Sequence, residues 1–136
     1  MKIAALLLAL AIACSGCDQK SQSFSDYAEL ERRDALQSGW FPEWLPASSY
    51  DIEEAHDMDT NESMLSAKYK QDSLLLPPPC ERVGTVPAAP FQKDWWPDSD
   101  TLSSANGWHL YSCQNGAYAA VHQAKQLLLH WRPDGS

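Results

Sequence analysis

The sequence predicts an α+β fold, in which an N-terminal helix is followed by a small antiparallel sheet with a C-terminal three-stranded meander. Three observations favour this class. A segment that begins with helix-capping residues precedes Gly39, residues 64–70 alternate between apolar and polar side chains, and three strand-like segments follow residue 106. A chain of 136 residues with 44% hydrophobic content is large enough for one such domain, which we place at residues 24–136.

The predicted helix begins at a capping residue, Ser25 or Asp26, whose side-chain oxygen can accept a hydrogen bond from the first turn. Glu29 lies in that turn, and Gly39 can end the helix because glycine adopts the left-handed conformation without strain. The side chains expected to face inward are Phe24, Tyr27, Leu30 and Leu36.

Residues 39–46 form a segment that we call the strap. Its two prolines fix φ and prevent regular pairing, so an irregular conformation is expected. The aromatic residues of the strap suit either packing over the end of a sheet or presentation to a partner. Burial in the core is the more common use of such side chains, but aromatics also dominate interface hot spots. The candidate partner-binding residues are therefore Trp40, Phe41 and Trp44.

Residues 52–70 predict a β-hairpin. Leu65, Ala67 and Tyr69 alternate with polar side chains, and this period of two is typical of a strand. The sequence at 60–62 is suited to a turn. A helix at residues 49–57 is the alternative for the first half of this segment.

Six of the nine prolines occur between residues 77 and 97. They exclude both a long helix and a central strand, because proline lacks the backbone N–H that both structures use. We expect this segment to form a loop that wraps around the domain.

The clearest pattern comprises the strand-like segments at residues 107–113, 117–122 and 126–132. The first two are joined by a turn containing Asn115 and Gly116, and Asn-Gly is the strongest short-range hairpin signal. These segments predict the C-terminal meander. Its core should come largely from Trp108, Leu110, Val121, Leu127, Leu129 and Trp131.

The first seventeen residues have the pattern of an export signal. Lys2 precedes an apolar run at residues 3–13, which is too short to span a bilayer permanently, and Ser15 and Gly16 then precede Cys17. This pattern resembles that of bacterial lipoproteins, in which a lipobox ends at the cysteine that is lipidated. The resemblance implies a signal peptide at residues 1–16, lipidation of Cys17 and a polar tether at 17–23. Lipidation of Cys14 and cleavage as a plain secreted protein are the alternatives.

The resemblance implies a location in the cell envelope, facing the periplasm and held to the membrane by the N-terminal lipid. The position of Asp18 directly after Cys17 resembles an inner-membrane retention signal of enterobacterial lipoproteins. Other lineages follow different rules, so the sequence does not decide between the inner and the outer membrane. Residues 39–61 also resemble a pattern of small uncharacterised bacterial proteins, which implies no activity.

Cys80 and Cys113 are the two cysteines left after lipidation of Cys17. An even pair in an oxidising compartment predicts a disulfide, and closing this 34-residue loop would stabilise the fold by roughly 3 to 4 kcal/mol. The alternative is a cysteine nucleophile paired with His109 or His122.

We expect no metal site and no cofactor. If the Asn-Gly turn has two residues, His109 faces His122 across the hairpin, but His130 cannot readily join them and no third ligand is specified. The acidic run at residues 56–61 lacks the glycine and the downstream glutamate of a calcium loop. Turn-forming Asx side chains explain that run better.

The sequence narrows the functional classes. A formal charge of −8 without a basic patch argues against nucleic-acid binding. Common catalytic motifs are absent, so we do not expect an enzyme. The sequence favours a membrane-anchored envelope lipoprotein that binds another envelope protein as an accessory or inhibitor module. A small-ligand or metal-binding lipoprotein and an envelope hydrolase are the alternatives.

Overall fold

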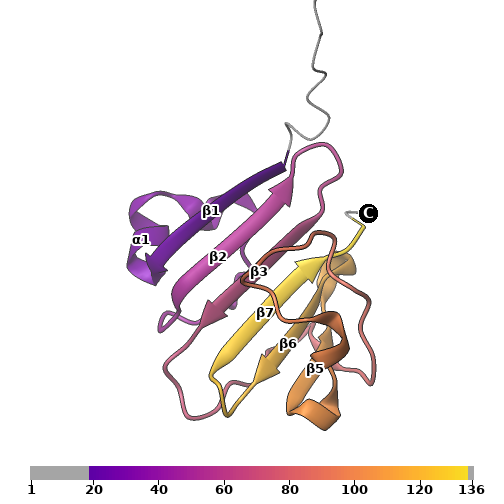
Figure 1. Ribbon diagram of the computed structural model, residues 1–136. Coiled ribbons are helices and arrows are strands. Elements are labelled where there is room, and N and C mark those ends of the chain that lie inside the picture. Colours follow the sequence, from indigo (N-terminus) through magenta and orange to yellow (C-terminus); the bar gives the residue numbers. More distant parts are fainter. Residues whose placement is uncertain (1–18, 135–136) are drawn as a thin grey trace, which may run out of the picture.

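The computed structural model describes residues 19–134, which contain one seven-stranded antiparallel sheet with the strand order β1-β2-β3-β7-β6-β5-β4 (Figure 1). The elements are β1 (Gln19–Asp26), α1 (Tyr27–Arg32), β2 (Tyr50–Asp57), β3 (Ser63–Lys68), β4 (Glu81–Arg82), β5 (Trp108–Ser112), β6 (Tyr118–His122) and β7 (Leu127–Arg132). Short 3-10 turns occupy Ala35–Ser38, Ser99–Thr101, Ser104–Asn106 and Gln114–Gly116. The candidate lipidation residues Cys17 and Cys14 lie outside the described residues.

The predicted α+β class with an N-terminal helix is wrong, because the domain is mostly β and its first described element is a strand. Strand β1 contains residues 19–23, which we expected in a tether, and pairs with β2 along its length. Its sequence concealed it because β1 is an edge strand in which only Phe24 is buried. Backbone pairing holds such a strand in place without an apolar stripe.

The expected helix exists, but it has only six residues. Asp26 caps it as predicted, since the Asp26 carboxylate accepts a hydrogen bond from the Glu29 N–H at 2.9 Å. The helix ends early because Asp34 adopts a left-handed conformation, with φ of 52°. A 3-10 turn follows and ends at Gly39, whose φ of 89° strains residues other than glycine.

The hairpin predicted at residues 52–70 is confirmed as β2 and β3, and the alternative helix at 49–57 is wrong. Asp57 organises the connecting turn, because its carboxylate accepts hydrogen bonds from the N–H groups of Asp59 and Thr60 at 2.8 and 3.1 Å. These contacts are those of an Asx turn, as expected for the acidic run.

The C-terminal meander is confirmed, but its predicted register is wrong by one residue. The first turn has three residues, with Asn115 at φ of 60°, so Trp108 pairs with His122 and His109 pairs with Val121. A one-residue shift moves a side chain to the opposite face of a sheet. His109 and His122 therefore point to different faces, which removes the expected histidine pair.

Different segments cover the two faces of the sheet. We call the strap face the one covered by α1, by the strap and by residues 74–80, and the loop face the one covered by residues 83–107. The connection to β5 crosses the sheet in Figure 1, as expected for a wrapped loop. It is held there by Trp131, whose indole N–H donates to the Pro87 carbonyl at 3.1 Å and whose ring contacts Trp96 edge-on.

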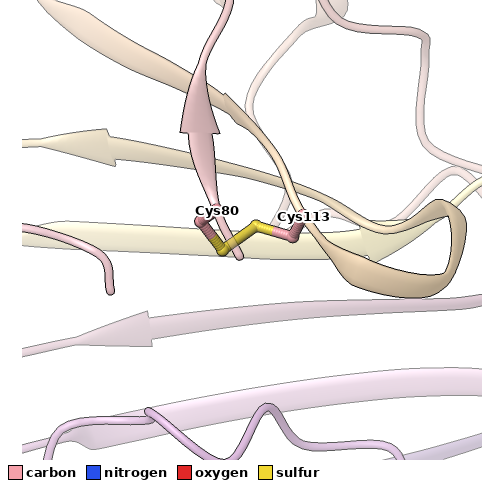
Figure 2. Close-up of a disulfide and its surroundings, with 2 residues drawn as sticks. All are labelled: Cys80 and Cys113. Carbon is pink, nitrogen blue, oxygen red and sulfur yellow. A yellow bond between two sulfur atoms is a disulfide. The ribbon is translucent and has the colours of Figure 1, made fainter. Parts of the chain in front are cut away.

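The predicted disulfide is confirmed. Cys80 lies just before β4 and is bonded to Cys113, which precedes the turn after β5 (Figure 2). The bond therefore attaches the beginning of the wrapped loop to the end of β5. No helix among residues 19–134 is long and apolar enough to cross a membrane.

Candidate functional site

Antiparallel pairing aligns two rows of side chains on the strap face, at the end of the sheet where β1 begins. The row nearer to that end contains Lys20, His56, Ser63 and Arg132. The adjacent row contains Gln22, Glu54, Leu65 and His130. Polar and ionisable groups from four strands are thereby brought beneath the strap.

Glu54 is fully buried in this cluster. Its carboxylate accepts a hydrogen bond from the Gln22 amide at 2.7 Å and lies 2.9 and 3.0 Å from Nδ1 of His56. Burial raises the pKa of Glu54, while the contacts with Gln22 and His56 act against that increase. The pair holds the His56 ring in one orientation.

The strap covers this cluster with aromatic rings. Trp40 stacks on His56, and Trp44 meets His130 edge-on, with ring centroids 5.7 Å apart. Phe41 is 5% exposed and packs edge-on against Phe24 at 5.7 Å. Of the three candidate partner-binding residues, Phe41 is therefore a core residue, whereas Trp40 and Trp44 are only partly buried.

A pocket of about 250 Å³ lies beside the strap. Its lining includes strap residues such as Glu43 and Trp44, together with the disulfide and the turn after β5. His130 and Arg132 of β7 complete the lining. We call this hollow the strap pocket.

The two β7 side chains carry polar atoms without partners. Nδ1 of His130 and Nε of Arg132 are buried, and neither has a hydrogen-bond partner within the described part of the chain. Burial, together with the positive charge of Arg132, lowers the pKa of His130 to about 4. At neutral pH the pocket therefore contains one guanidinium cation and an uncharged imidazole.

His122 does not extend this site. His122 lies on the loop face, where Nε2 is 3.0 Å from the Asn106 carbonyl and Nδ1 accepts from the Lys125 N–H at 3.2 Å. Both nitrogens are thus occupied. Over residues 19–134, no three His, Cys, Asp or Glu side chains are grouped as metal ligands.

Our sequence reasoning missed Glu54 and Arg132 as members of a site and placed His56 in the acidic turn. One local signal was available, because Ile52, Glu54 and His56 alternate and must share a face of β2. The contribution of β7 depends on the long-range pairing of β3 with β7, which has no local signature.

A family model described as the YbbD head domain matches residues 18–66. No curated protein and no solved structure matches the chain significantly. The matched region extends from β1 into β3, so it contains the strap, Glu54 and His56 but not the β7 residues of the pocket. It also includes residues 39–61, where we noted a resemblance to small bacterial proteins. The similarity indicates a domain of a small bacterial protein.

Proposed function

We propose that this protein is a lipid-anchored envelope protein that binds another envelope protein at the strap pocket, as an accessory or inhibitor module. The observation that carries the proposal is the position of Trp44. Its ring is partly exposed at the edge of a pocket that contains the unpartnered Arg132. Tryptophan and arginine, with tyrosine, are the residues enriched in the energetic hot spots of protein interfaces.

The strap is already ordered, which favours binding. Phe41 anchors it in the core, and the Leu45 N–H donates to the Pro42 carbonyl at 3.1 Å. The Ser49 N–H likewise donates to the Pro46 carbonyl at 3.0 Å. A partner would meet a surface that loses little conformational entropy on binding.

The geometry of Glu54 and His56 fits a binding site better than the active site of a hydrolase. A carboxylate that orients a histidine through Nδ1 is found in general acid–base sites, and Glu54 and His56 have that relationship. However, Trp40 covers the His56 ring, and His56 is only 6% exposed. Ser63 lies opposite His56, but no hydrogen bond joins their side chains within the described part of the chain.

Site-specific photocrosslinking in living cells tests the proposal. The full chain would carry a photoactivatable phenylalanine in place of Glu43, an exposed strap residue at the pocket. We expect one discrete protein adduct from the envelope fraction. The matched control places the same group at Leu75, which is 76% exposed and does not line the pocket. Identical adducts at both positions, or none at position 43, would contradict binding at the strap.

A further inference from the structure

Two residues that line the strap pocket each have a buried side-chain nitrogen without a partner among the described residues. Nε of Arg132 and Nδ1 of His130 belong to residues two apart on β7, so their side chains share the strap face. Leaving a buried polar atom unpaired opposes folding, and such atoms are uncommon in native proteins. A ligand that accepts hydrogen bonds from both residues would remove this cost.

The charge of Arg132 is also without a counterpart. None of the ion pairs within residues 19–134 includes it. Glu54, one row away, is already bonded to Gln22 and His56, and the exposed Glu43 makes no ion pair with any residue that the structure describes. The guanidinium therefore keeps its donors for a group that enters from outside.

We propose that the strap pocket binds one carboxylate group of the partner polypeptide, with Arg132 as the charged donor and His130 as a second donor. This inference rests on the proposed function. The planar guanidinium of arginine matches a carboxylate in a two-point hydrogen-bonded pair. The apolar atoms next to the carboxylate would contact the Trp44 ring.

Size and charge favour this ligand over a larger anion. The pocket volume of about 250 Å³ is below the range of roughly 300 to 1,000 Å³ that is typical of small-molecule sites. A pocket of this volume can hold the carboxylate end of a single residue of the partner. A single cation beside a neutral imidazole, with Glu43 at the pocket and a chain charge of −8, favours a monoanion over a dianionic phosphate.

Binding of small probes tests the inference directly. The probes are N-acetyl-dialanine with a free carboxylate, its C-terminal amide, an N-acetylated glutamate amide, and inorganic phosphate. Each is titrated into the full-length chain in detergent while the indole N–H resonance of Trp44 is followed by NMR. We expect saturable binding of the free acid and at least tenfold weaker binding of its amide. If the glutamate amide binds as well as the free acid, the carboxylate of the partner can come from an acidic side chain. If the glutamate amide does not bind, the carboxylate comes from a chain terminus.

Variants connect the binding to the arginine. Arg132→Gln should weaken binding of the free acid at least tenfold, and Arg132→Lys should weaken it less. The matched control, Arg32→Gln, removes the same charge from an exposed position on α1 and should leave binding unchanged. Gln114→Glu places a negative charge in the exposed turn at the pocket and should also weaken binding of the free acid by repulsion. Because this variant does not change β7, it tests the inference even if the arginine variants unfold.

The opposite results would overturn the inference. It fails if the amide binds as well as the acid, if phosphate binds more tightly than the acid, or if neither Arg132→Gln nor Gln114→Glu weakens binding. If the photocrosslink at position 43 persists while no carboxylate probe binds, the carboxylate inference is wrong and the proposed function stands. If the acid binds through Arg132 but no crosslink forms, the proposed function is wrong and the pocket is still a carboxylate site.

Discussion

Trp40 lies flat against the imidazole ring of His56, with ring centroids 4.1 Å apart and planes 8° from parallel. This stack attaches the strap to the polar rows of the sheet, because His56 is also held by Glu54. The strap therefore has a defined position beside its pocket. Its aromatic side chains nevertheless differ in how much of the fold depends on each.

Phe41→Ala should destabilise the domain by about 3 to 5 kcal/mol, because it removes a buried ring from the core. Trp44→Ala should cost less, about 1 to 2 kcal/mol, since that ring is partly exposed and contacts His130 by its edge. Urea unfolding followed by circular dichroism measures both losses. Equal losses would show that Trp44 is as much a core residue as Phe41.

Glu54→Gln should flatten the pH dependence of stability. The pKa of Glu54 is raised above 4.5 in the folded state, so the folded protein holds this proton more tightly than the unfolded chain does. The free energy of unfolding should therefore fall as the pH rises from about 4.5 through the folded-state pKa. Urea unfolding of the parent chain and of Glu54→Gln between pH 4 and 8 would reveal this contribution as the difference between the two profiles, since both keep the opposing contribution of His130. A fall of the same size in Glu54→Gln would assign it to another group.

His130 should act in the opposite direction. Its pKa is about 4 in the folded state, against 6.5 as the ordinary value, so the unfolded chain binds this proton first as the pH falls. The contribution of His130 to stability should decline by about 2 to 3 kcal/mol as the pH drops from 6.5 to 4, against the opposite contribution of Glu54. His130→Asn should lose most of that decline in the same titration. An unchanged profile would mean that the folded protein accommodates the charged imidazole.

Breaking the disulfide should lower the free energy of unfolding by roughly 3 to 4 kcal/mol, because the loop from Cys80 to Cys113 regains freedom in the unfolded chain. Replacing both cysteines by serine avoids a leftover thiol. Thermal and urea unfolding of this double variant, compared with the oxidised parent, give the difference. Equal stability would mean that the pairings of β4 and β5 already define this corner of the sheet.

Cys17→Ser should release the protein from the membrane fraction, because lipidation at that cysteine is the predicted anchor. Cys14→Ser is the control and should remain membrane-bound. Mass spectrometry of the mature N-terminus should find an acylated Cys17. If Cys14→Ser is released and Cys17→Ser is retained, the anchor is the earlier cysteine.

The strands of the meander could be predicted because alternation and the Asn-Gly turn are local properties of the sequence. Their register could not, since it depends on whether the turn contains two or three residues, and Asn115 permits both. Strand β1 was hidden for a different reason. An edge strand whose side chains mostly face water has no hydrophobic pattern to recognise.

The site was harder to predict than the strands. Glu54 and His56 are close in sequence, but Arg132 joins them only because β7 pairs with β3 across the long wrapped connection. Such pairing is decided by the packing of the whole domain. The burial of Phe41 could not be predicted either, because it depends on the contact of that ring with Phe24 across the fold.

Strand β1 begins at Gln19, two residues after the predicted lipidated Cys17, and if that prediction holds the short spacing limits how far the domain can lie from the membrane. Two extended residues span about 7 Å, so an acylated Cys17 would hold the first strand directly above the lipid headgroups. The beginning of β1 and the end of β7 lie at the same end of the sheet (Figure 1). Arg132 would then lie at the membrane-proximal end of the sheet, and a polypeptide that reaches it would bind close to the membrane surface.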